Sequence, residues 1–175
     1  MWAYYNYAIT SLVLMGIVAV VYCTRFRVRT LLSICFVFNL AVSMLCAALD
    51  IAADYTSALY GSIPDFVPVL FDQLYFAVLI LQPYAFFLYA YTLSVKRKRL
   101  TGKLLAAFTV PLVLLEALCA LTPAVHWLYS IDAGGLQNGP AYILMFVEGI
   151  FYICAALIVM HVQRAHVLRR ERIGV

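Results

Sequence analysis

Long runs of apolar residues, separated by short polar and charged stretches, are the dominant pattern of this chain. Five of these runs are long enough to cross about 30 Å of hydrocarbon as α-helices, at a rise of about 1.5 Å per residue. The pattern predicts membrane spans over residues 3–24, 30–54, 66–95, 104–122 and 140–163. We therefore expect an all-α, polytopic transmembrane helical bundle that forms a single domain over residues 1–175.

Composition supports the same class. Hydrophobic residues make up 66% of the 175 residues and charged residues 11%, whereas about a quarter of an ordinary soluble domain is charged. Residues 1–7 contain no Lys or Arg, so the first run lacks the basic region of a cleaved signal peptide. We expect this run to be retained as a helix.

The basic residues predict the orientation of the chain. All twelve Lys and Arg residues lie in segments 25–29, 96–103 and 164–172, which follow the first, third and fifth spans. The positive-inside rule places these segments in the cytoplasm. The prediction is a multi-pass protein of the inner (plasma) membrane with its N-terminus outside, its C-terminus inside, and a basic cytoplasmic helix over residues 164–175.

Two further features concern the connections and the helix interiors. Residues 54–64 form a short outer turn, whereas residues 122–140 contain several glycines and interfacial aromatics and are predicted to form a turn-rich cap. Pro83 and Pro111 lie inside the third and fourth spans, where each removes a backbone hydrogen bond and is expected to bend its helix.

Seven of the eight acidic residues lie outside the cytoplasmic segments, and three of them, Asp72, Glu116 and Glu148, lie at membrane depth. A carboxyl group there costs several kcal/mol unless it is paired, hydrated or protonated. No Lys or Arg lies at that depth, so these groups are expected to be protonated, to share protons or water, or to bind a cation. Asp50 and Asp54 lie nearer the outer surface, where solvation is the favoured interpretation and cation binding the second.

Aromatic side chains at helical spacing accompany two of these carboxyls, near Asp72 and near Glu148. We predict an outward-opening pocket between spans three, four and five for a cationic or hydrogen-bonding small molecule. For the carboxyls, and for Gln82 beside Pro83, the alternative is an interhelical hydrogen bond that only fixes the packing. The predicted ligand-binding residues are Asp72, Tyr75, Phe76, Gln82, Glu116, Glu148 and Tyr152.

Several functional classes lack their characteristic residues. Every lysine lies between Lys96 and Lys103, so no span offers a lysine for a retinal Schiff base, and His161 is the only histidine within a span, which excludes paired-histidine haem ligation. The five cysteines are scattered, and the sequence contains no metalloprotease, serine-hydrolase or phosphate-loop motif. We predict no enzymatic activity in this chain, no cofactor, no metal site and no nucleic-acid partner.

A set of short motifs carries a family resemblance. They are Gln82-Pro83, the aromatic run 86–92, Pro111, the segment 121–127 from Leu121-Thr122-Pro123 to Trp127, and the outer-loop segments 130–135 and 138–140. Over residues 66–172 the chain resembles the N-terminal membrane-sensor regions of bacterial histidine kinases and diguanylate cyclases, described as the seven-helix histidine-kinase sensor region.

The resemblance implies a bilayer-embedded stimulus sensor that binds a small molecule, works as a homodimer and signals through its last helix to a cytoplasmic kinase or cyclase domain. The chain departs from the family by having five spans and no output domain, which either a truncated chain or a five-helix variant would explain. An alternative is a small substrate-binding membrane component of a transporter. A third is a purely structural bundle subunit in which all the buried carboxyls serve packing.

Overall fold

The computed structural model describes residues 2–25, 30–59, 61–94, 102–132 and 135–173. It contains helices α1 (Trp2–Arg25), α2 (Leu31–Ala58), α3 (Phe66–Ser94), α4 (Gly102–Val125) and α5 (Ile143–Ile173), with strands β1 (Tyr129–Asp132) and β2 (Gly135–Asn138) between α4 and α5. All five helices are long and apolar enough to cross a membrane. The prediction of five apolar, membrane-length helices is therefore confirmed.

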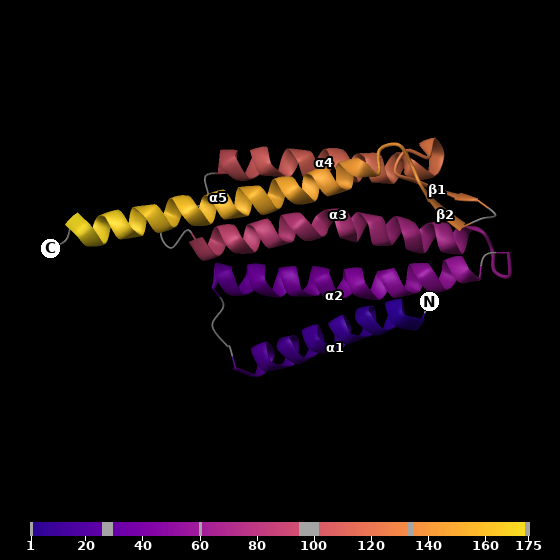
Figure 1. Cartoon of the computed structure of the whole chain (residues 1–175), viewed down its shortest axis with the longest axis horizontal. Coiled ribbons are helices and arrows are strands. Elements are labelled where there is room, and N and C mark those ends of the chain that lie inside the picture. The colour runs from indigo at the N-terminus through magenta and orange to yellow at the C-terminus, as the bar shows by residue number, and fades with distance from the viewer. Residues whose placement is uncertain (1, 26–29, 60, 95–101, 133–134, 174–175) are drawn as a thin grey trace.

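Successive helices run in opposite directions, so the N-terminus lies at the end of the bundle that carries the hairpin, and the C-terminus lies at the other end (Figure 1). Helix α3 is central because it packs against α2, α4 and α5, whereas α1 packs mainly against α2. Any change on the α2 side of α3 can therefore reach α5 through a single helix.

Aromatic side chains join α3, α4 and α5 into one core. The ring of Phe87 lies 4.6 Å from that of Phe108 and 5.8 Å from that of Tyr152, measured between ring centroids. The Tyr152 hydroxyl donates a hydrogen bond of 2.6 Å to the carbonyl oxygen of Phe108. Buried aromatic pairs of this kind add roughly 0.5–1.5 kcal/mol beyond their burial of surface, so they stabilise the packing of these three helices.

The predicted outer cap is a two-stranded antiparallel hairpin, with Tyr129 opposite Asn138 in the register. The hairpin is held by a close backbone contact, in which the N–H of Gly139 donates to the carbonyl of Leu128 at 2.8 Å. A Cβ at position 139 would lie 2.2 Å from the carbonyl oxygen of Trp127, so glycine is required there. The cap therefore contains paired β-strands, and not only the turns that the sequence predicts.

Helix α4 extends to Val125, beyond the predicted end of the fourth span at residue 122. His126 follows in the left-handed region, with φ 53°, and its N–H donates to the carbonyl of Thr122 at 2.7 Å. This is a helix C-cap in which one bond satisfies an end carbonyl. Pro123 sits inside the last turn without ending the helix.

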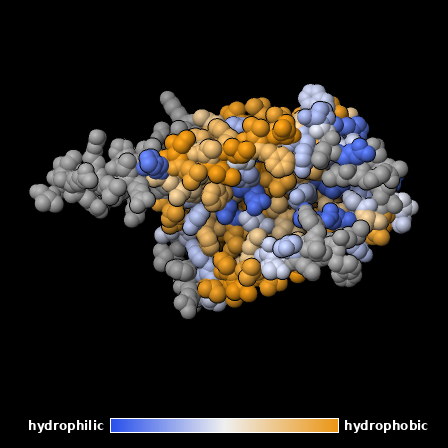
Figure 2. Space-filling model, viewed as in Figure 1, coloured by the Kyte–Doolittle hydropathy of each residue, from blue (hydrophilic) through white to orange (hydrophobic). Residues whose placement is uncertain are grey.

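Helix α1 is the least enclosed element. Between residues 7 and 24, where its side chains are described, none is buried. Near its C-terminal end the ring of Tyr22 lies 4.6 Å from that of Phe36 on α2. Figure 2 shows the apolar surface expected of a bilayer-facing bundle, interrupted by hydrophilic residues between α2 and α3. One face of α1 lines the cavity described next.

Candidate functional site

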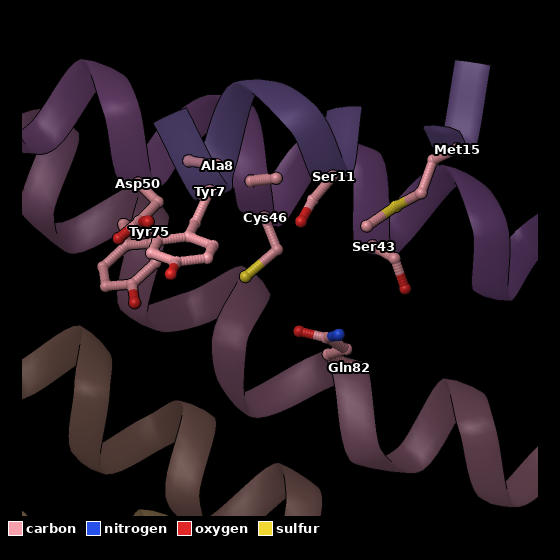
Figure 3. A pocket seen from close by; sticks show the side chains of 10 residues that line it. Tyr7, Ala8, Ser11, Met15, Ser43, Cys46, Asp50, Tyr75 and Gln82 are labelled. Carbon is pink, nitrogen blue, oxygen red and sulfur yellow. The ribbon is translucent and has the colours of Figure 1, made fainter. Parts of the chain in front are cut away.

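A cavity of about 310 Å³ lies between α1, α2 and α3. It is lined by Tyr7, Ala8, Ser11 and Met15 of α1, by Ser43, Cys46, Ala47 and Asp50 of α2, and by Tyr75 and Gln82 of α3 (Figure 3). On α1 and α2 the lining positions recur at intervals of three and four residues, which is the spacing of one helix face. Tyr75 and Gln82 were predicted from the sequence, but their neighbours come from α1 and α2 rather than from α4 and α5.

The cavity is polar at both ends. Figure 3 shows the rings of Tyr7 and Tyr75 beside Asp50 at one end, with the Gln82 amide and the Ser43 hydroxyl toward the other. Tyr7 is 78% exposed, so the end near Asp50 is open. Sequence reasoning favoured solvation for Asp50. It gave no weight to small and hydroxyl residues on the same face of α2, which are the signal for a lined cavity.

Asp72 lies elsewhere on α3 and faces α2 and the hairpin. Its side chain is 3% exposed, and its Oδ2 atom accepts a hydrogen bond of 3.4 Å from the Ser57 hydroxyl. One turn further on, the Phe76 ring stacks on Tyr129 of β1 with centroids 4.7 Å apart. Both predicted residues thus contact neighbours that fix the hairpin end of α3, and neither lines the cavity.

Glu116, Glu148 and Tyr152 gather between α4 and α5. Glu148 is 6% exposed, and in the described part of the chain neither of its carboxyl oxygens has a hydrogen-bond partner. Glu116 lies close enough to interact with it electrostatically. Tyr152 is fully buried and already donates to α4. None of these three residues lines the cavity, so the predicted single pocket is divided among three regions: the cavity, the hairpin end of α3, and the space between α4 and α5.

Gln73 is a connecting residue that sequence reasoning missed. Its Nε2 atom donates to the carbonyl oxygen of Cys119 on α4 at 2.7 Å, and its Oε1 atom accepts from the Tyr129 hydroxyl at 2.5 Å. Burial, with smaller contributions from nearby Cys119 and Asp72, raises the pKa of Tyr129 above its ordinary value. One amide therefore ties α3 to both α4 and the hairpin.

No family model, curated protein or solved structure matches this chain. The resemblance to bacterial sensor regions therefore stays a prediction that rests on the short sequence motifs alone.

Proposed function

We propose that this chain is the membrane-embedded sensing module of a bacterial signalling receptor of the histidine-kinase or diguanylate-cyclase kind. A small molecule enters the cavity between α1, α2 and α3 from the outer side, and its presence is passed through α3 to α5. The module contributes binding and transmission, and the attached cytoplasmic domain contributes the chemistry.

The observation that carries the proposal is the double role of α3. Tyr75 and Gln82 on one face line the cavity, and α3 also packs against α5. At Gly149 of α5, an added Cβ would lie 3.8 Å from the ring of Pro83. Gln82 and Pro83 are adjacent, so a displacement of the cavity wall acts directly on the contact with α5.

Helix α5 is suited to carry the signal away. It is continuous over 31 residues, from Ile143 to Ile173, and its C-terminal part extends past the ends of the other helices (Figure 1). A change at the level of Gly149 is therefore delivered about 36 Å further along one rigid element, at 1.5 Å per residue. A domain attached beyond the last turn of α5 would be displaced or rotated by this movement of the helix.

Charge supports the direction of signalling. The Lys and Arg residues lie at or just after the C-terminal end of α1, between α3 and the first turn of α4, and in the C-terminal part of α5, and the positive-inside rule assigns that end of the bundle to the cytoplasm. The hairpin, the N-terminus and the open end of the cavity would then face outward. This orientation makes the cavity accessible to molecules outside the cell and aims α5 at the cytoplasm.

The coupling is tested without knowing the ligand, by filling the cavity. Ala47→Phe places a ring in the cavity, whereas Ala48→Phe adds the same ring at the neighbouring exposed position of α2. Spin labels at Ile34 of α2 and His161 of α5, in a background whose five native cysteines are replaced, report the distance between these helices.

We expect Ala47→Phe to change the distance distribution measured by pulsed electron paramagnetic resonance, and Ala48→Phe to leave it as in the parent. A ligand in the same cavity acts in the same way if it favours one arrangement of the helices. Identical distributions in all three proteins would contradict transmission from the cavity to α5.

A further inference from the structure

The described residues that line the cavity between α1, α2 and α3 carry a negative charge. Among the described residues that line it, Asp50 is the only charged one, and none is basic. On α1 the nearest basic residue, Arg25, is ten positions beyond Met15, or about 15 Å along the helix. Among these lining residues an anionic ligand would find no cationic partner, whereas a cationic ligand would find one acid.

The two ends of the cavity differ in chemistry, and their separation can be measured along the helices. Asp50 and Ser43 lie seven residues apart on α2, and Tyr75 and Gln82 lie seven residues apart on α3, which is about 10 Å in each case. Because α2 and α3 are antiparallel, Tyr75 meets Asp50 at one end and Gln82 approaches Ser43 at the other (Figure 3). The site is elongated, with an acid at its open end and neutral hydrogen-bonding groups at its inner end.

The aromatic residues at the open end favour an organic cation. The rings of Tyr7 and Tyr75 lie beside Asp50 (Figure 3), and an ammonium group near the face of a tyrosine ring is attracted to its π-electrons. A metal ion instead requires several oxygen, nitrogen or sulfur ligands, and in the described residues no group of three or more His, Cys, Asp or Glu side chains could hold one. Desolvation of a bare ion would not be offset here.

From these observations we infer that the cavity binds an elongated organic monocation, an amine whose ammonium group lies against Asp50 between Tyr7 and Tyr75 and whose far end bonds Gln82 and Ser43. The volume of about 310 Å³ corresponds to about ten water molecules at roughly 30 Å³ each, which suits a small amine. This inference rests on the proposed function, since it names the class of molecule that the sensor would detect.

The test uses matched pairs of amine and alcohol, with the purified chain in lipid nanodiscs at neutral pH and isothermal titration calorimetry. One pair is tyramine and 4-(2-hydroxyethyl)phenol, and the other is 5-aminopentanol and pentane-1,5-diol. 4-Hydroxyphenylacetate serves as the anionic analogue. At least one amine is expected to bind about tenfold more tightly than its alcohol, and the anion more weakly than both.

Two variants locate the binding. Asp50→Asn should lower the affinity for the amine about tenfold or more and leave the affinity for the alcohol unchanged, while Gln82→Leu should weaken both. Asp54→Asn is the matched control, because it removes the acid one turn further along α2, at an exposed position that does not line the cavity. Unchanged thermal unfolding of each variant shows that its fold is intact.

Equal binding of amine and alcohol in both pairs would overturn the inference. So would equal losses in Asp50→Asn and Asp54→Asn, which would indicate general surface charge. If Asp50→Asn does not fold, Gln82→Leu and the amine and alcohol pairs decide. Binding of the amine without a change in the distance from Ile34 to His161 would refute the sensing function and keep the ligand class. A change of this distance in Ala47→Phe, with no preference for amine over alcohol in wild type, would refute the ligand class and keep the sensing function.

Discussion

The side-chain amide of Gln73 on α3 donates a hydrogen bond of 2.7 Å to the carbonyl oxygen of Cys119 on α4. That carbonyl would ordinarily accept from the N–H of the residue four positions later, which is Pro123 and has none. A proline in the last turns of α4 thus creates an acceptor, and α3 supplies the donor. This hydrogen bond helps to fix the position of α3 against α4, two apolar helices.

Replacement of Gln73 by Leu is therefore expected to destabilise the protein. It leaves the Cys119 carbonyl and the Tyr129 hydroxyl without a partner, and each buried unsatisfied group costs about 1–3 kcal/mol. Thermal unfolding in detergent measures the loss. Gln137→Leu, at an exposed position of β2, is the matched control and should change stability by less than about 0.5 kcal/mol. Equal effects of the two substitutions would show that the Gln73 hydrogen bonds contribute nothing.

Alkaline pH should weaken the fold through Tyr129. Burial raises the pKa of this residue in the folded state, whereas in the unfolded chain the pKa of tyrosine is about 10. The contribution of Tyr129 to stability is complete below about pH 10 and is lost as the pH rises above it, because the unfolded state ionises first. Wild type should therefore lose more unfolding free energy than Tyr129→Phe between about pH 9 and 11. A constant difference between the two would contradict this.

Helix number and type could be predicted from the sequence because both depend on local properties. Five apolar runs of sufficient length give five membrane-length helices, and Pro83 and Pro111 do lie inside α3 and α4 as expected. The hairpin was missed because residues 122–140 carry glycine and proline signals of turns rather than an alternation of apolar and polar residues. Strand β1 contacts α3 and α4, and β2 contacts α2, and no local sequence pattern reveals these contacts.

The candidate site was predicted only in part, because depth along a helix does not determine which neighbour a residue faces. Tyr75 and Phe76 are adjacent, yet Tyr75 lines the cavity toward α1 and α2 while Phe76 stacks on Tyr129. Adjacent helical positions differ by about 100° around the axis. Without the rotation and the neighbours of α3, the sequence could not separate Asp72 from Glu148, or recognise Asp50 as a lining residue.

Replacement of Glu148 is expected to stabilise the protein, whereas replacement of Gln73 is expected to destabilise it. Its buried carboxyl has no hydrogen-bond partner among the described residues, so replacing it removes an unfavourable group. Glu148→Met is expected to raise the unfolding free energy by about 1 kcal/mol or more, with a smaller gain for Glu116→Met, whose side chain is only half-buried. A loss of stability in Glu148→Met would indicate that the carboxyl holds a proton donor or a cation in the folded protein.

Gly139 provides the sharpest steric test of the hairpin. In Gly139→Ala the new Cβ would lie 2.2 Å from the carbonyl oxygen of Trp127, and because that atom belongs to the backbone the chain itself must move. The movement weakens the bond from the Gly139 N–H to the Leu128 carbonyl, so we expect a loss of about 1–3 kcal/mol. Gly16→Ala is the control, because nothing lies within 4 Å of its added Cβ and alanine favours a helix by roughly 0.5–1 kcal/mol. The two substitutions should therefore shift the unfolding temperature in opposite directions, and a shift of the same sign and size would rule out the close approach at Trp127.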